Sequence, residues 1–399
     1  RRAGSLSSRQ HHERPHPPAE RRAGVRRSWW RADPLLVGAS LVLAAIGVVM
    51  VYSATRNGQA ALGLGPHYFM ERQAIFVVLG LVVMVVLAAV DYHWVEAAST
   101  VLYVGIVLAL LAMFAIGHRA LGATRWINIG PFQLQPSAFA VLAEICVVAA
   151  YCARRPEGLE TRDLLKILFL QAVPIILVVK QPDLGSAIVL GVVLVVMLIM
   201  AGLPNRHLVA LVLAAALAAF AMIHFGLLHH YQLERLTSFL HQNQGAQSTT
   251  YNLHQSVAAI GSGGLLGTGL FKGLGTNLAF VPEQQTDFIF SAVGEQLGFV
   301  GSVAVLVLEA VVCWRLLRAA QQARDDLGRL VAIGAFAFFA FSVFETPAWP
   351  WASCPSPASP CPSSATGVRP RWRSSQPSAW PSRCSSDGPG DRSGPPGGP

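Results

Sequence analysis

An acidic residue, Asp287, stands at the end of a Gly-rich polar segment and directly before a long apolar run. The polar segment covers residues 251–287, and the apolar run covers residues 288–314. A carboxylate at the mouth of a membrane helix indicates chemistry or transport more often than a scaffold, because a charge there is expensive to maintain. The alternative is a helix cap, since Asp287 stands where a helix N-terminus favours an anion.

Two further charged residues of this segment are candidates for the same chemistry. Glu283 lies four residues before Asp287, so the two side chains would share a face if the helix began earlier. Glu283 is then either a second acid or a solvated loop charge. Lys272 supplies a cation in the same segment.

The glycines between residues 261 and 275 resemble a phosphate-binding loop only superficially. No Gly-Lys-Ser/Thr sequence follows them and no strand precedes them, so a P-loop is excluded. They indicate tight packing or a re-entrant loop that is shielded by protein. The histidines of the loop and the six cysteines of the chain show no metal-ligand spacing, and the cysteines do not form a disulfide framework.

The elements that must position these residues are membrane helices. The chain of 399 residues is 53% hydrophobic and 13% charged, which excludes a soluble protein. The predicted fold class is an all-α polytopic membrane protein, because helices satisfy their own backbone in lipid and no alternating barrel pattern is visible. About nine apolar segments can span a bilayer: 34–52, 73–90, 96–116, 137–152, 164–179, 184–202, 207–228, 288–314 and 329–344.

The distribution of arginine predicts the orientation of these segments. With a cytoplasmic N-terminus, the Arg-rich loops after the fourth, sixth and eighth segments are also cytoplasmic. Residues 229–287 then form a long extracytoplasmic loop between helices seven and eight. Much of the net charge of +9 lies in residues 1–33, which we interpret as a disordered cytoplasmic tail near anionic membrane lipid and not as a nucleic-acid-binding segment.

The composition changes abruptly after Glu345. Residues 34–345 form the predicted transmembrane domain, whereas residues 346–399 are rich in Pro, Ser and Arg and contain no spanning segment. Trp has a single codon, so the junctions Trp349-Pro350 and Trp351-Ala352 constrain the underlying nucleotides. Restoring one nucleotide after the Glu345 codon permits Asn-Thr-Gly-Met and later Val-Thr-Gly-Ile-Pro-Leu-Pro. We therefore expect residues 346–399 to be an out-of-frame tail that replaces a last loop and a tenth helix.

Ordered motifs along the chain resemble the SEDS family of peptidoglycan glycosyltransferases. They are GATRWINIG (122–130), FQLQPS (132–137), KQPDLGSAIVL (180–190), QSVAAIGSGGLLGTG (255–269) and PEQQTDFIF (282–290). The shifted tail is similar to a further loop of that family. TDFIF and the AIGSGG run look more like the RodA branch, which elongates the wall, than the FtsW division branch.

The resemblance implies an enzyme of the bacterial cytoplasmic membrane that polymerises lipid II, an undecaprenyl-diphosphate-linked saccharide, outside that membrane. A 4-hydroxyl must attack an anomeric carbon, so a carboxylate can take the proton while cations steady the departing diphosphate. In the family this catalytic carboxylate maps to Asp287. A class B penicillin-binding protein, which is a transpeptidase, is the expected partner.

The same resemblance implies a substrate-binding set around Asp287: Arg125, Lys180, Asp183, Lys272, Glu283, Gln255 and Ser256. A guanidinium such as that of Arg125 suits a diphosphate. Asp183 could orient the diphosphate or hold a divalent cation such as Mg²⁺, although no cofactor is certain. The alternative is an Asp helix cap beside a snorkelling Lys180.

Three positions depart from the family pattern. Gln285 replaces a common His, and Ala138 and Val141 replace a Glu and a Lys after the QPS motif. In the family pattern the Glu and the Lys would form an ion pair inside the membrane. Their joint loss is consistent with that pairing, because either charge alone would be costly to bury. These departures and the changed tail keep open an inactive truncated family member. A flippase or transporter of a lipid-linked precursor also stays open, because the chain has many helices and intramembrane polar groups.

Overall fold

The computed structural model describes most of the chain between residues 33 and 351. The described residues are 33–57, 65, 67–116, 118–120, 123–129, 132–155, 158–181, 183–226, 248–278, 284, 286 and 288–351. The two predicted tails lie almost entirely outside this set.

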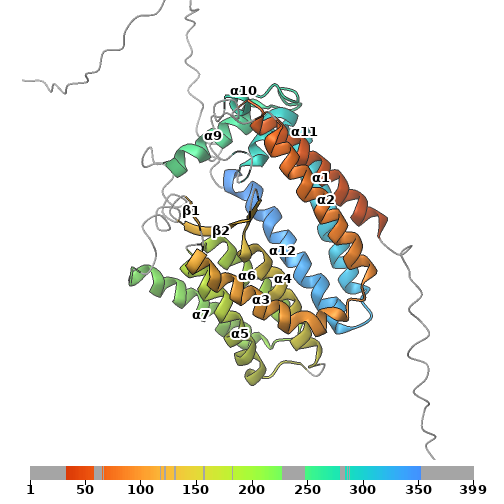
Figure 1. The fold of residues 1–399 in the computed structure, drawn as a ribbon, viewed down its shortest axis with the longest axis vertical. Coiled ribbons are helices and arrows are strands. Elements are labelled where there is room, and N and C mark those ends of the chain that lie inside the picture. Colours follow the sequence, from red (N-terminus) through yellow and green to blue (C-terminus); the bar gives the residue numbers. More distant parts are fainter. Residues whose placement is uncertain are drawn as a thin grey trace, which may run out of the picture. The chain divides into compact units, whose positions relative to one another are not determined.

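Helices dominate the described residues, and each of the nine predicted apolar segments coincides with one of them (Figure 1). These helices are α1 (Pro34–Thr55), α2 (Tyr68–Ala89), α3 (Trp94–Ile116), α4 (Pro136–Ala153), α5 (Thr161–Lys180), α6 (Leu184–Met200), α7 (Asn205–His224), α11 (Ile289–Gln321) and α12 (Asp326–Trp351). Two further helices, α9 (Ser248–Ser262) and α10 (Leu274–Asn277), lie in the predicted long loop.

Seven of the described helices are long and apolar enough to cross a membrane. The helices at the other two predicted spans, α5 and α6, do not meet the criteria of length and apolar character, for different reasons. Helix α6 is strongly apolar but has only 17 residues. Helix α5 begins with charged residues and contains the buried Gln171 and Pro174, which lower its apolar character. The polytopic helical fold that the sequence predicts is confirmed.

A small antiparallel sheet precedes α4, where the sequence analysis expected only a loop. Its strands are β1 (His118–Ala120), β2 (Ala123–Ile129) and β3 (Phe132–Leu134), and β2 lies in the middle. Strand β1 pairs with β2 through Ala120 opposite Ala123, and β2 pairs with β3 through Ile129 opposite Phe132. The sheet leads the chain directly into the start of α4.

The helices pack around two apolar cores. The larger core joins α3, α4, α6 and α12 through side chains that include Leu110, Ile145, Leu190 and Leu330. The smaller core joins α1 to α11 through Met50, Ala292, Val293 and Val305. Helix α12 contacts α4 and α6 as well as α11, so it links the two groups (Figure 1).

Contacts between segments that are far apart in the sequence define one end of the bundle. They join Asp33 with Arg315, Tyr92 with Asp325, Glu96 with Arg154 and Thr161 with His207. The hydrogen bond from Tyr92 to Asp325 is the main reason why the pKa of Tyr92 is raised to about 12. The loops that meet here are the ones for which the arginine distribution predicts a cytoplasmic position.

A second set of contacts defines the opposite end. These contacts join Ser53 with Gln296, Arg56 with Phe271, Asn57 with Asn277 and Gln135 with Asp183. The segments involved are the ones predicted to be extracytoplasmic, including the Gly-rich segment. Because successive helices alternate between the two sets, the described chain has the connectivity that a membrane bundle requires.

Candidate functional site

Helix α11 is broken near its start, and the break organises the Gly-rich segment. Gly298 has φ 66° and ψ −164°, which is outside the helical region although helix continues on both sides. A side chain is disfavoured at this positive φ. Space excludes one as well, because a Cβ on Gly298 would lie 2.2 Å from the backbone nitrogen of Gly267. The close approach of the two glycines confirms the tight packing predicted from the glycine content.

The loop between α9 and α10 replaces the backbone hydrogen bonds that α11 loses at its break. Thr268 and Gly269 donate their N–H groups to the carbonyls of Glu295 and Gln296, at 2.9 and 3.1 Å. In return, the N–H groups of Phe299 and Val300 donate to the carbonyls of Gly264 and Leu265, at 2.9 and 3.1 Å. Backbone groups inside a membrane protein must find such partners because lipid offers none. Loop and helix are therefore joined through their main chains.

Glu295 is a buried carboxylate that fixes the next part of the loop. Its side chain is 1% exposed and accepts hydrogen bonds from the backbone N–H of Gly275 at 2.7 Å and of Thr276 at 2.9 Å. The Thr276 hydroxyl donates a third bond at 2.6 Å. These N–H groups belong to the first turn of α10, where an anion is favoured. A Cβ on Gly273 would lie 2.7 Å from this carboxylate, so the loop follows it closely.

Gln296, the next residue of α11, holds the turn before α10. Its side-chain oxygen accepts hydrogen bonds from the Ser53 hydroxyl at 2.7 Å and from the Phe271 N–H at 2.9 Å. Phe271 has φ 67°, a value that is uncommon for a residue with a side chain. Such a conformation persists where the surroundings enforce it. Here α1 and α11 enforce it together.

Arg56, at the end of α1, completes the clamp on this turn. Its guanidinium donates to the Phe271 carbonyl and lies 4.9 Å from the centre of the Phe271 ring. The Asn277 amide donates to the same carbonyl at 3.2 Å, and Asn57 donates to Asn277 at 2.9 Å. Lys272 follows Phe271 directly and is exposed. The predicted substrate-binding cation therefore sits on a turn that is held from three sides.

Gln284 anchors the segment that carries the predicted catalytic residue. It is 2% exposed and donates to the Ser291 hydroxyl at 3.1 Å and to the Thr276 hydroxyl at 3.4 Å. Asp287 and Glu283 themselves lie outside the described residues, so their roles stay predictions. Phe288 is the N-cap of α11, so the chain enters the helix one residue after Asp287.

Asp183 is the N-cap of α6, one of its two predicted roles. One carboxylate oxygen accepts hydrogen bonds from the hydroxyls of Ser186 at 2.7 Å and Ser137 at 3.0 Å, and from the Gln135 amide at 3.2 Å. Its other oxygen accepts a longer hydrogen bond, from the Ser186 N–H at 3.4 Å, so the carboxylate both caps α6 and joins it to the start of α4. The described residues contain no group of three or more His, Cys, Asp or Glu side chains that could hold a metal.

The remaining predicted substrate-binding residues are spread over several elements. Lys180 ends α5 and is exposed, and Arg125 lies in β2, although its side chain is outside the described residues. In α9, Gln255 is partly buried and Ser256 is fully buried. The structure thus records two separate groups of contacts, one around Asp183 where α4 and α6 begin and one that fixes the Lys272 turn.

Glu295 and Glu144 are buried acidic residues that the sequence analysis missed. Glu295 plays the structural role described above, and its signal was an acidic residue inside an otherwise apolar predicted helix. Glu144 in α4 is 1% exposed, and neither of its carboxylate oxygens has a hydrogen-bond partner among the described residues. It lies one turn after Val141, which is buried in the larger core where the family pattern has Lys.

The fold and the site together define a polytopic helical membrane protein with a broken helix and a loop clamped at one end of the bundle. The family model described as "Cell cycle protein", which groups FtsW, RodA and SpoVE, matches residues 34–347. The chain belongs to this family, the SEDS family.

Relatives from two branches of the family are similar to the chain to nearly the same degree. A probable peptidoglycan glycosyltransferase FtsW from Trichlorobacter lovleyi is 33% identical over 77% of the chain and 81% of the relative. The peptidoglycan glycosyltransferase MrdB of Escherichia coli K12 is 34% identical over 78% of the chain and 82% of the relative. A solved structure described as a peptidoglycan synthase complex matches with a TM-score of 0.67 and 25% identity, over 81% of the chain and 88% of that chain.

Proposed function

We propose that the protein is a peptidoglycan glycosyltransferase that polymerises lipid II into glycan strands during cell elongation. The observation that carries the proposal is the clamped segment of residues 263–278, which Glu295, Gln296 and Arg56 hold against α1 and α11. A catalyst needs its groups fixed before the substrate arrives. The names of the FtsW and MrdB relatives support the same activity.

In the proposed reaction, the 4-hydroxyl of one saccharide attacks the anomeric carbon of another. A new carbon–oxygen bond forms, the bond from the anomeric carbon to the diphosphate breaks, and undecaprenyl diphosphate leaves. Asp287 takes the hydroxyl proton as general base. Lys272 stabilises the departing diphosphate, and Arg125 and Lys180 contribute further positive charge at the same end of the bundle.

The expected surroundings of this enzyme follow from the same proposal. We place it in the bacterial cytoplasmic membrane with a cytoplasmic N-terminus, so that the end with Lys272 is extracytoplasmic. A class B penicillin-binding protein is its proposed partner, supported by the solved relative described as coordinating "polymerization and crosslinking". The RodA-like TDFIF and AIGSGG sequences support elongation over division. Asp183 takes part through the shape of the α4–α6 junction, since its oxygens already accept hydrogen bonds.

Incubation of the purified protein with lipid II tests the proposal. Two proteins are assayed: the 399-residue chain, and the form expressed from a gene with one nucleotide restored after the Glu345 codon. We expect glycan chains from the restored form and weak or no activity from the 399-residue chain, because the replaced loop would face the compartment of Asp287. The end of the family match at residue 347 supports the frame error. Resequencing across this codon checks it directly.

Asp287→Asn in the restored form should lower the polymerisation rate at least about a hundredfold, because the amide cannot accept the proton. Asp91→Asn is the matched control, since Asp91 is an exposed carboxylate at the opposite end of the bundle. Normal chain growth by Asp287→Asn would contradict the assigned base. Movement of lipid II between leaflets without chain growth would instead favour the flippase alternative.

A further inference from the structure

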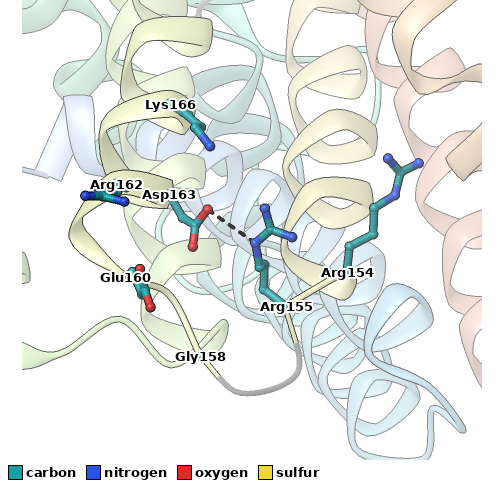
Figure 2. A pocket seen from close by; sticks show the side chains of 7 residues that line it. All are labelled: Arg154, Arg155, Gly158, Glu160, Arg162, Asp163 and Lys166. Atoms are coloured by element: carbon teal, nitrogen blue, oxygen red, sulfur yellow. Dashed lines mark hydrogen bonds and ion pairs between the residues drawn. The ribbon is translucent and has the colours of Figure 1, made fainter.

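An open pocket of about 620 Å³ lies at the opposite end of the bundle from the candidate site, where α4 ends and α5 begins. Six charged side chains line it: Arg154, Arg155, Glu160, Arg162, Asp163 and Lys166. Figure 2 shows Arg155 and Lys166 directed into the space between the two helices, whereas Arg162 extends from the other side of α5. Four cations and two carboxylates give this lining a net positive charge, which favours an anion.

Pairing within the protein uses only part of this positive charge. Arg155 forms an ion pair with Asp163 at 3.2 Å, and Arg154 forms one with Glu96 at 2.8 Å (Figure 2 shows the former). Arg162 and Lys166 are exposed, and neither has a carboxylate within ion-pair distance in the part of the chain that the structure describes. Two cations of the pocket are thus available to a ligand.

The two available cations belong to one face of α5, which is charged near the start of the helix and apolar further along it. Arg162, Leu165, Lys166 and Phe169 follow the i, i+3, i+4, i+7 spacing of one helix face. Leu165 is 61% exposed and Phe169 is 79% exposed. A lysine in this position extends its ammonium group toward the membrane surface. This face therefore offers positive charge at headgroup depth and apolar contact immediately deeper in the bilayer.

The basic surface continues across the adjacent loop to α7. A second pocket, of about 510 Å³, shares Glu160 and Arg162 with the first and is also lined by Arg206 and His207. The His207 ring contacts the Thr161 hydroxyl at 3.0 Å, which ties the start of α7 to the start of α5. A ligand with more than one phosphate, or two neighbouring lipids, would find cations in both pockets.

We propose that this end of the protein binds the headgroup of an anionic phospholipid. The phosphate contacts Lys166 in the first pocket, Arg162 adds positive charge from the other side of α5, where it lines the second pocket, and the acyl chains lie along Leu165 and Phe169. The apolar part of this face favours a lipid over a soluble phosphate, which would gain nothing from it. The sequence predicts that this end faces the cytoplasmic leaflet, where basic clusters beside membrane helices attract anionic lipid. The site is separate from the proposed polymerase chemistry and does not depend on it.

Native mass spectrometry of the purified full chain tests the proposal. The protein is offered equal amounts of phosphatidylglycerol and phosphatidylcholine with the same acyl chains. We expect selective retention of phosphatidylglycerol, and at least about tenfold weaker retention by the variant Arg162→Gln/Lys166→Gln. The variant Arg318→Gln/Arg324→Gln removes two exposed cations from the same end of the bundle, outside the pocket, and should bind as the wild type does.

A charge-conserving variant, Arg162→Lys/Lys166→Arg, should bind phosphatidylglycerol as the wild type does. Substitution at these two positions would then not by itself disturb folding, and the loss in the glutamine variant would come from the missing charge. Equal losses in the pocket variant and the Arg318/Arg324 control would overturn the site, because general surface charge would then explain retention. Displacement of phosphatidylglycerol by millimolar inorganic phosphate would overturn the choice of a lipid. Undecaprenyl diphosphate is the last competitor. If it displaced bound phosphatidylglycerol when present at a lower concentration than that lipid, the pocket would bind the lipid diphosphates of the polymerisation reaction instead.

Discussion

Glu295 connects the chemistry of single residues to the shape of the candidate site. Its carboxylate receives two backbone N–H groups and a hydroxyl from Gly275 and Thr276, and Thr276 in turn contacts Gln284. Gln284 is three residues before Asp287. A buried acidic group therefore does not need to meet the substrate in order to matter for activity, because its contacts reach Thr276 and, through Thr276, the segment before the predicted base.

Replacement of this carboxylate should destabilise the protein. Glu295→Leu leaves the donors of Gly275 and Thr276 buried without acceptors, which we expect to lower the free energy of unfolding by about 2–5 kcal/mol. Glu295→Gln keeps one acceptor oxygen and should cost less. Denaturant unfolding in detergent, followed by circular dichroism, measures both changes.

Glu96→Leu is the control for this prediction. Glu96 pairs with Arg154 at 2.8 Å, and its side chain is 40% exposed, so its loss should cost no more than about 1 kcal/mol. Equal effects of Glu295→Leu and Glu96→Leu would show that the hydrogen bonds of Glu295 add little.

At the scale of elements, the broken helix α11 and the glycine loop behave as one unit. Gly298→Ala would place a methyl group against the backbone of Gly267 and force a side chain into a positive φ. We expect a loss of about 2–4 kcal/mol in the free energy of unfolding, together with lower polymerase activity.

Gly191→Ala provides the matched control within α6. Within the described part of the chain, no atom outside the backbone of α6 itself lies within 4 Å of a Cβ placed at Gly191, and the residue is in the interior of a regular helix. Alanine should therefore stabilise the helix there by about 0.5–1 kcal/mol. If both alanine variants unfolded like the wild type, the contact between Gly298 and Gly267 would have no energetic importance.

The sequence could predict the elements that local sequence patterns determine, and it could not predict those that depend on contacts between distant residues. The nine helices follow from apolar runs of sufficient length, and the cap at Asp183 follows from its place before α6. The partners of Glu295 lie about 20 residues away in a Gly-rich segment, and no periodic pattern connects them. The β1–β3 sheet was missed because its three short strands lie in a connecting loop. Long-range hydrogen bonding decided these features, and local propensity did not.

At the scale of the whole molecule, Tyr92 and His93 join the turn between α2 and α3 to the turn between α11 and α12. Tyr92 donates a hydrogen bond to Asp325, and the His93 ring lies 3.9 Å from the same carboxylate. The hydrogen bond between His93 and Asp91 raises the pKa of His93 above its usual 6.5, and the Asp325 charge raises it further. A histidine with a raised pKa stabilises the folded state below pH 6.5. That contribution is lost as the pH rises through the folded-state pKa.

The variant Asp91→Asn should therefore move the pKa of His93 back toward 6.5 and weaken the fall of stability above that pH. Nuclear magnetic resonance of histidine-labelled protein reports the ring titration, and thermal unfolding across the same pH range reports stability. Tyr92→Phe is the comparison, because it removes the contact to Asp325 but keeps the partner at Asp91. An unchanged titration in Asp91→Asn would contradict the assigned cause.

The shared backbone hydrogen bonds of α11 have a consequence for biosynthesis. Residues 263–278 precede α11 in the chain, so the loop is synthesised before the helix. Until the two meet, the N–H groups of Phe299 and Val300 lack their partners in Gly264 and Leu265. We therefore expect the break at Gly298 to take its final form only when the loop docks against the helix.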